Sequence, residues 1–485
     1  MEGVETASNE RPHDMCFQVR RIFLFLIVAI LYALVFFQRT CPSIVSTEMA
    51  LDYNKTTSDL SIFSSIFFYP YGIVQPFAGL LADIIEPSYV IGIMQIIASI
   101  GTIVCGASGN IGVGCAARFF CGLGCGPTYV PVCRIILAWF PQKNYAIMVG
   151  ILLAFGGVGS IIAQAPLAQL ATSIGWRGSF YLIGGINLFF SILCLIFVRG
   201  NPTKLNYLPV NTELTANSGE QTTTKEKLLT LRNNFVKVVT YPFFWLIVVY
   251  AVFSSGPYFD ISGMWISPYL QHVLGYSRQE SGNVSIMLSV GLIAGSLLIP
   301  PLSTFLRTRK WPCFVSSLIA AVVSLVFYLL SADKISEVLV YFLLFFIGAF
   351  TNALTSVCYP LVSEYFHPSI AGTAVGCSNI FTFLSSAVFQ TISSSIIEKY
   401  GTVEGTTDVY TEKGYKQGLW LVCLVSFLVS MVAIAITKDM QKKKEEEEIS
   451  QSREMEEESD QQSKQPEEEV KRPTKEDTGS DLEEV

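Results

Sequence analysis

Charged residues are scarce in this sequence. They make up 15% of its 485 residues, whereas a soluble protein carries roughly 25%. The charge that is present gathers at one end, because residues 441–485 hold 17 acidic and 8 basic residues, a net charge of −9 in a chain whose total is −7. The acidic balance therefore belongs to the tail, and the remainder, at +2, gives no reason to expect a nucleic-acid partner.

The sequence also lacks the patterns of metal sites and enzymes. Its three histidines, His13, His272 and His367, are widely scattered, and no Cys-x-x-Cys pair stands beside them. Most of the twelve cysteines lie in apolar runs, where cysteine acts as a small buried hydrophobic residue. There is no nucleotide-binding glycine loop and no nucleophile with a base in order. We therefore predict no metal, no cofactor and no enzymatic activity.

Apolar residues in long runs dominate the rest of the chain. Hydrophobic residues make up 51% of it, and the mean hydropathy is +0.47. A helix of about 20 apolar residues crosses the hydrocarbon of a bilayer. We predict an all-α integral membrane protein of twelve transmembrane helices. They cover residues 22–45, 58–82, 89–107, 113–137, 144–170, 178–198, 241–271, 281–305, 312–332, 337–363, 369–397 and 416–437.

Basic residues in the short loops predict the orientation. Residues such as Lys143 and Arg199 favour the side that holds the N-terminus, which the positive-inside rule assigns to the cytosol. Both termini are then cytosolic, and the sequon Asn54-Lys55-Thr56 falls in the first outside loop, where Asn54 is a candidate glycosylation site. We expect the plasma membrane or an endolysosomal or vacuolar membrane.

The same pattern divides the chain into five parts. A polar stretch rich in Asn, Thr and Lys separates two sets of six helices, and the charged tail cannot bury a core. The predicted parts are a cytosolic N-terminal segment 1–19, a six-helix bundle 20–198, a cytosolic linker 199–240, a second six-helix bundle 241–440 and a disordered acidic tail 441–485.

The two sets of helices are related by a repeat at a fixed offset of 226 residues. The second and eighth helices slip from this offset by about five residues. Two similar halves can rock against each other and expose a site between them to each side in turn. The matched pairs are Pro42 with Pro268, Gly122 with Gly348, Phe140 with Phe366, Val149 with Val375, Gly150 with Gly376 and Gln164 with Gln390.

Several motifs resemble those of the major facilitator superfamily, over residues 20–440. The run from Gly79 to Asp83 is similar to the family's loop between helices two and three, although residues 84–88 replace its usual basic residues. Arg118, followed by the glycines of residues 122–126, resembles the fourth-helix arginine motif. The resemblance implies a transporter with two pseudo-symmetric bundles that works by alternating access.

Two subfamilies share shorter stretches with the chain. Helix one with Arg39, and residues 70–83, resemble organic-anion and sugar-phosphate permeases, which carry a second arginine in helix seven. Here the repeat mate of Arg39 is Trp265, and that departure argues against phosphate exchange. Residues 132–140, with Arg134, resemble the same segment of lysosomal dipeptide transporters.

Ionisable groups inside membrane helices cost free energy, so each one is a candidate for a functional role. Arg39 is our candidate anchor for an anionic group, with an interfacial arginine reaching outward as the alternative. Asp260 is a candidate to pair with Arg39, to bind a proton or to recognise an amino group. The candidate substrate-binding residues are Arg39, Arg134, Asp260, Trp265, Gln164, Gln390 and Tyr71. The candidate gating or structural residues are Asp83, Arg118, Glu364 and Gly79.

The sequence therefore favours a transporter for a small organic solute that bears a carboxylate, with protons as a candidate coupling ion. Two alternatives stay open. One is a dipeptide or amino-acid exporter of a lysosome-like compartment, and the other is a non-transporting membrane sensor or adaptor that signals through the acidic tail.

Overall fold

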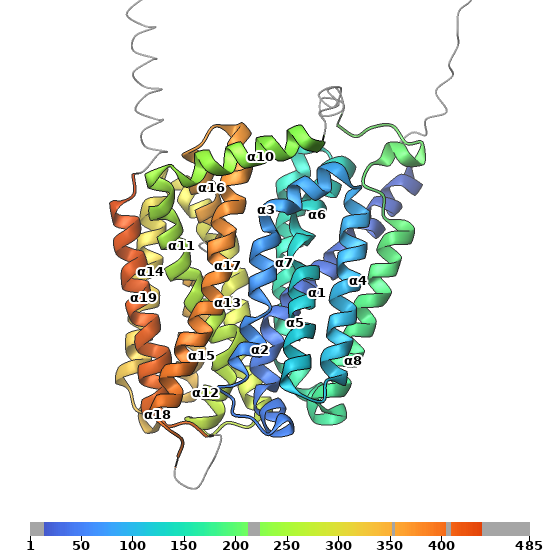
Figure 1. Ribbon diagram of the computed structural model, residues 1–485. Helices are drawn as coiled ribbons and strands as arrows, with labels where there is room; N and C mark the ends of the chain where they lie inside the picture. The colour runs from blue at the N-terminus through green and yellow to red at the C-terminus, as the bar shows by residue number, and fades with distance from the viewer. Residues whose placement is uncertain (1–13, 212–223, 352–354, 404–408, 439–485) are drawn as a thin grey trace, which may run out of the picture. The chain divides into compact units, whose positions relative to one another are not determined.

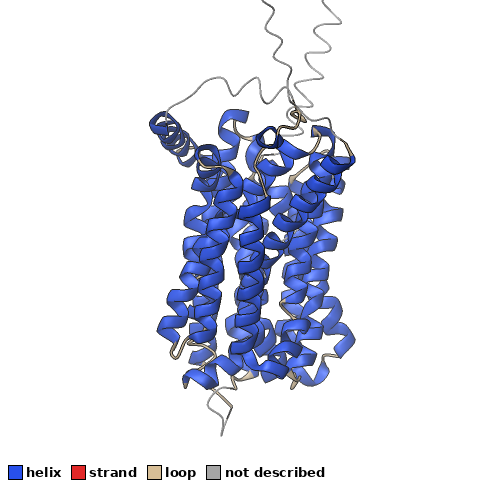
Figure 2. Cartoon of the chain, turned by 90° about the vertical axis from the view of Figure 1, so that its right-hand side faces the viewer, coloured by secondary structure: helices blue, strands red, loops and turns tan. Residues whose placement is uncertain are grey.

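The computed structural model describes residues 14–211, 224–351, 355–403 and 409–438. The acidic tail, most of the N-terminal segment and part of the linker lie outside these ranges. Within them the regular structure is helical, and two residues form an isolated β-bridge (Figure 2). The described residues hold eleven helices that are long and apolar enough to cross a membrane.

The first half of the chain holds eight α-helices (Figure 1). They are α1 (Met15–Tyr53), α2 (Ser61–Ser65), α3 (Phe68–Ile84), α4 (Pro87–Ala107), α5 (Ile111–Cys125), α6 (Tyr129–Trp139), α7 (Tyr145–Ile162) and α8 (Ala165–Phe197). The predicted helix at 144–170 is interrupted at Ala163 and Gln164, and α8 continues through Gly175 into the predicted sixth helix. Gly175 has φ 74°, a left-handed conformation that glycine adopts without strain, and it marks the bend between the two spans.

The second half begins after α10 (Thr224–Val239), a helix that the predicted linker did not anticipate. Its helices are α11 (Pro242–Asp260), α12 (Ile266–His272), α13 (Arg278–Phe305), α14 (Lys310–Leu329), α15 (Glu337–Thr351), α16 (Thr355–Glu364), α17 (Pro368–Lys399), α18 (Glu412–Tyr415) and α19 (Leu421–Ile436). A π-helical turn, η5 (Ile261–Trp265), joins α11 to α12. α15 and α16 flank residues 352–354 in the place of the predicted tenth helix.

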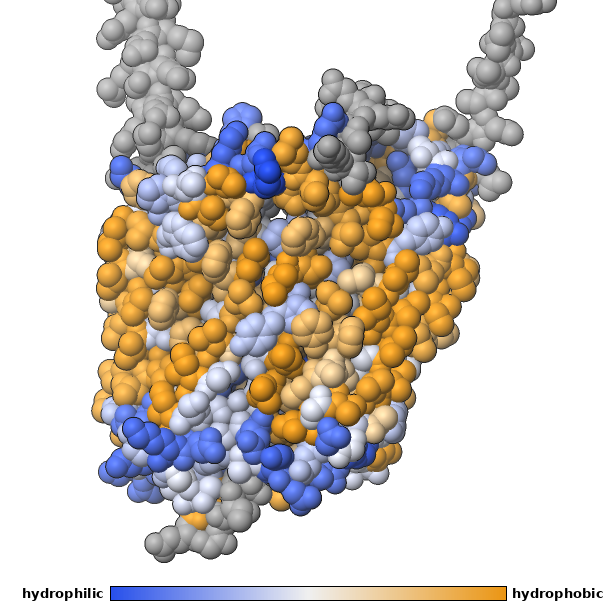
Figure 3. Space-filling view, in the orientation of Figure 1, coloured by the Kyte–Doolittle hydropathy of each residue, from blue (hydrophilic) through white to orange (hydrophobic). Residues whose placement is uncertain are grey.

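Six helices form most of the boundary between the halves. α17 packs against α2 and α3, and α13 packs against α7 and α8. We call the side of the bundle that carries α10 the linker side and the other the far side; they are the upper and lower ends in Figure 1. Between them the surface is a broad apolar belt with hydrophilic residues at both ends (Figure 3), as a bilayer requires.

The repeat is visible in how two of its glycines pack. A Cβ on Gly122 would lie 2.0 Å from the carbonyl oxygen of Phe67, and one on Gly348 would lie 2.1 Å from that of Leu288. Both glycines therefore allow close helix crossings. The two glycines are 226 residues apart, whereas Phe67 and Leu288 are 221 apart, which is the five-residue slip of the second and eighth helices.

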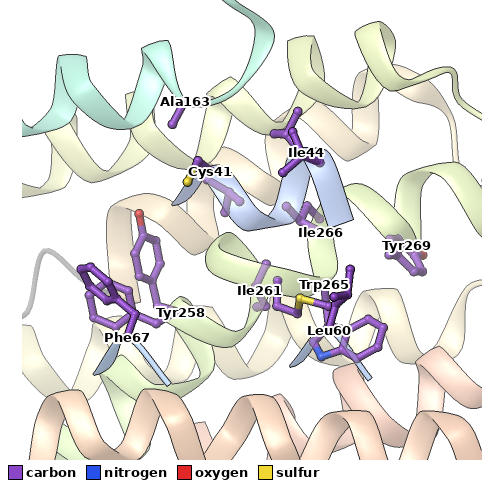
Figure 4. Close-up of a cluster of buried hydrophobic side chains, with 14 of the residues drawn as sticks. Cys41, Ile44, Leu60, Phe67, Ala163, Tyr258, Ile261, Trp265, Ile266 and Tyr269 are labelled. Atoms are coloured by element: carbon purple, nitrogen blue, oxygen red, sulfur yellow. The ribbon is translucent and has the colours of Figure 1, made fainter. Parts of the chain in front are cut away.

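A buried apolar cluster crosses the boundary of the halves (Figure 4). Cys41 and Ile44 of α1 lie beside Ile266 at the start of α12, and all three are at most 1% exposed. Leu60 and Trp265 belong to the same cluster. The two halves are thus in close apolar contact in this region.

Candidate functional site

A cavity of about 760 Å³ lies between the halves on the linker side. Its walls come from α3, α6, α10, α16 and α17, so both halves contribute to it. The residues at its wall are Gln75, Pro76, Gly79, Leu80, Tyr129, Val130, Arg134, Glu226, Thr230, Leu231, Asn234, Tyr359, Ser363, Ala371, Gly372, Thr373, Val375, Gly376 and Asn379. A cavity of this size holds a small solute.

Arg39 is buried in the middle of α1 next to this boundary. It is 6% exposed, and its guanidinium donates a hydrogen bond to the Tyr71 hydroxyl. The guanidinium carbon lies 4.4 Å from the ring centre of Phe36, 4.6 Å from that of Tyr71 and 5.0 Å from that of Phe383. Arg39 forms no ion pair with the residues that the structure describes, and its Nε has no hydrogen-bond partner there. A buried cation without an anion is costly, and the aromatic faces offset only part of that cost.

The aromatic groups around Arg39 come from both halves. Tyr71 lies on α3 and Phe383 on α17, with 4.6 Å between their ring centres. Gln75, one helical turn after Tyr71, lines the linker-side cavity. Arg39 therefore lies against two contacting rings, one from each half. One of them, Tyr71, is one turn of α3 away from Gln75 in the cavity wall.

Arg118 supports α1 at the residue next to Arg39. Pro42 has no backbone N–H, so the carbonyl of Gln38, four residues earlier, lacks its helical donor. The Arg118 guanidinium supplies it, with 2.9 Å from Nη2 to the Gln38 carbonyl oxygen and 3.1 Å from Nη1 to its side-chain Oε1. Gln38 was not among the residues predicted from the sequence, although Pro42 four residues later was the available signal.

Asp260 lies at the end of α11, directly before the π-helical turn, and is fully buried. Its Oδ2 accepts a hydrogen bond from Ser393, while Oδ1 has no partner among the described residues. Asp260 forms no ion pair with them either, so it does not pair with Arg39, which was one of its three predicted roles. A buried charge without a counter-charge is costly.

The remaining candidates for the substrate site lie apart from the cavity, with one exception. Gln164 donates to Ser289 Oγ at 2.7 Å across the halves, and Gln390 donates to the Phe259 carbonyl at 3.0 Å within the second half. Trp265 is fully buried, with its ring centre 5.9 Å from that of Tyr415. Arg134 is the exception, because it is exposed and lines the cavity.

Apart from the buried Arg118, the candidate gating or structural residues lie on the linker side. Gly79 lines the cavity, and Asp83 follows it near the end of α3. Glu364 at the end of α16 forms an ion pair with Arg309, 3.3 Å apart, within the second half. That pair ties α16 to the start of α14 and does not join the two halves.

Polar contacts close the far side between the halves. The Ser58 and Ser394 hydroxyls are 2.5 Å apart, and the Ser58 amide donates to the Tyr410 hydroxyl at 3.2 Å. Burial raises the pKa of Tyr410, so this hydroxyl stays neutral. An ion pair between Glu48 of α1 and Arg278 of α13 adds to the closure. The cavity is thus on the linker side, and these contacts join the halves on the far side.

The chain belongs to the Major Facilitator Superfamily. The model of this family matches residues 28–389 and, in a second match, residues 259–474. This confirms the family resemblance and the predicted all-α membrane fold, and it places the protein among transporters, not enzymes.

Three curated relatives cover most of the chain. The chain is 22% identical over 388 residues to a probable sulfoacetate transporter, SauU, of Cupriavidus necator, across 78% of this chain and 87% of that protein. It is 22% identical to a probable hexose phosphate transport protein of Chlamydia trachomatis, across 76% and 83%. It is 23% identical to the membrane sensor protein UhpC of Escherichia coli, across 77% and 85%.

Solved structures share the fold. A bacterial homologue of the human lysosomal transporter Spinster has a TM-score of 0.67 at 18% identity, across 86% of this chain and 96% of that one. The nucleoside transporter NupG has a TM-score of 0.66 at 14% identity, across 86% and 100%.

Proposed function

We propose that the protein carries a small organic anion, bound through a carboxylate or a similar group, by alternating access of its two halves. The observation that carries this proposal is Arg39, a buried guanidinium without an anionic partner among the described residues. Its two-pronged donor geometry suits a carboxylate or sulfonate. Two relatives are named for the anions sulfoacetate and hexose phosphate, which supports the same class of solute.

Alternating access is supported by the asymmetry between the two sides. The cavity opens between the halves on the linker side, while Ser58–Ser394 and Glu48–Arg278 join the halves on the far side. A second conformation would break these contacts and close the cavity. We propose that the linker side faces the cytosol, with both termini on that side, in the plasma membrane or an endolysosomal or vacuolar membrane.

We also propose that Asp260 carries the proton if transport is proton-coupled. It is a buried carboxylate with an unpartnered oxygen and without a neighbouring cation in the described residues. Such a group takes up a proton in the closed interior and releases it when water reaches it.

The test is ligand binding followed by uptake. Purified protein is screened for thermal stabilisation by dicarboxylates, sulfonates, amino acids, dipeptides and sugar phosphates, and each hit is repeated as uptake into liposomes. We expect a carboxylate- or sulfonate-bearing hit that Arg39→Ala abolishes. Arg20→Ala, at the linker-side end of the same helix, is the matched control and should keep the effect.

The screen also separates the alternatives. Stabilisation by dipeptides alone would favour the exporter of a lysosome-like compartment. A ligand that stabilises the protein without any uptake would favour the sensor, a role that the UhpC relative carries by name. A hit that persists in Arg39→Ala would overturn the assignment of Arg39.

A further inference from the structure

α10 has an outward face on which large apolar side chains are exposed. Leu228, Leu229, Phe235 and Val236 are 52%, 48%, 39% and 51% exposed. Their spacing places them on one stripe of the helix, with Arg232 in its middle. In water such a stripe would be unfavourable, because four large apolar side chains would stay hydrated.

The inward face of α10 is part of the transporter. Val238 is fully buried, and Leu231 and Asn234 line the linker-side cavity. α10 packs against α17 of the second half and α3 of the first, and it runs across their linker-side ends (Figure 1). The helix is therefore a strap that bridges both halves beside the cavity.

The C-terminal end of α10 lies where the membrane-spanning helix α11 begins. The Trp245 indole N–H, in the first turn of α11, donates to the Val239 carbonyl at 2.8 Å, and the ring is 41% exposed. Tryptophan at the end of a membrane helix is typical of the headgroup level. The strap thus joins the bundle at the depth where lipid headgroups lie.

The outward face also carries a positive charge. Arg232, in the middle of the stripe, is exposed and forms no ion pair with the residues that the structure describes. An amphipathic helix with basic residues beside large apolar ones binds in the plane of an anionic membrane surface. A lipid phosphate complements this cation, and the long stem of Arg232 reaches it from among apolar neighbours.

We propose that α10 is a membrane-surface helix that binds the anionic lipids of the linker-side leaflet. Its apolar stripe lies in the headgroup region, and Arg232 contacts a lipid phosphate. Since its other face forms part of the cavity wall, the lipid surface holds this wall in place. The proposal concerns the strap and the bilayer, and it is independent of which solute is carried.

The experiment places a reporter on the outward face of the full-length chain. Cys16, the one cysteine that is exposed among the described residues, is replaced by serine, and Val236→Cys is labelled with an environment-sensitive fluorophore. The labelled protein is reconstituted in nanodiscs of pure phosphatidylcholine or with about 30% phosphatidylserine. Quenching by lipids brominated near the headgroup reports contact with the bilayer.

We expect quenching by brominated lipid, stronger with phosphatidylserine and weakened several-fold by high salt or by Arg232→Glu. The matched control reverses two charges on the far side, Lys334→Glu with Lys399→Glu, and should leave the quenching unchanged. A fluorophore that stays in water in both kinds of nanodisc would overturn the proposal. So would a protected fluorophore that brominated lipid does not quench, because a protein partner would then cover the stripe.

Discussion

At the scale of single residues, the helix that carries Arg39 depends on a side chain of another helix for one of its backbone hydrogen bonds. Pro42 leaves the Gln38 carbonyl without its helical donor, and Arg118 replaces that donor from α5. Arg118 is fully buried, so its removal leaves the buried Gln38 carbonyl with only the weak Cys41 thiol donor, 3.7 Å away. The position of Arg39, one residue after Gln38, therefore rests on a contact between two helices.

This arrangement predicts a rescue. Arg118→Met should lower stability by about 1–3 kcal/mol, the cost of an unsatisfied buried polar group. Adding Pro42→Ala restores an N–H that can donate to the Gln38 carbonyl, so the double variant should recover part of the loss. Thermal unfolding of the two single variants and the double variant in detergent measures the recovered stability. Strictly additive losses would contradict the claim that Arg118 replaces the missing donor to the Gln38 carbonyl.

Asp260 gives a second prediction at this scale. Asp260→Asn keeps an oxygen that accepts from Ser393 and removes a carboxyl group that has no cationic partner among the described residues. We expect the variant to unfold within about 1 kcal/mol of the parent, while uptake no longer responds to a proton gradient. A large loss of stability would show instead that the ionised carboxylate has a structural partner.

At the scale of helices, close crossings depend on the repeat-paired glycines. Gly348→Ala would place a methyl group 2.1 Å from the Leu288 carbonyl, so α15 and α13 must move apart. We expect a loss of about 1–3 kcal/mol, as for other overpacked cores. Gly372→Ala is the control, because nothing lies within 4 Å of its Cβ, and it should be neutral or stabilising. The unfolding temperatures of the two variants measure this difference in stability.

The far-side closure predicts a cross-link between α17 and the loop before α2. Ser58 and Ser394 are neighbours in this conformation, so Ser58→Cys with Ser394→Cys should form a disulfide under mild oxidation. After cleavage at a protease site placed within residues 212–223, the two halves should stay joined on a gel until they are reduced. Uptake should stop on oxidation and return on reduction.

Either cysteine alone serves as the control, and it should give separate halves throughout. Continued uptake with the cross-link in place would contradict alternating access, because the far side would then never need to open.

At the scale of the whole molecule, apolar length and a duplicated pattern were enough to predict the fold. The helices followed from runs of apolar residues. The family, whose members are transporters and not enzymes, followed from motifs such as Gly79 to Asp83. The partners of each side chain did not follow. Phe383 stands over Arg39 from 344 residues away, and only the packing of α17 on α3 brings it there. α10 was missed because its polar residues dominated the linker's composition and hid a short apolar stripe.

The same scale separates a transporter from a sensor, since both occur among the relatives. Arg39, the cavity and the far-side contacts all lie within residues 14–438, whereas signalling through the acidic tail would need residues 441–485. Removing residues 441–485 should therefore leave ligand stabilisation and liposome uptake unchanged, because the tail supplies none of these groups. Uptake rates of the shortened and full-length chains, compared at equal reconstituted protein, make the test. Intact ligand binding with lost uptake would mean that the tail takes part in the conformational cycle, and an absence of uptake in both chains, despite binding, would favour the sensor.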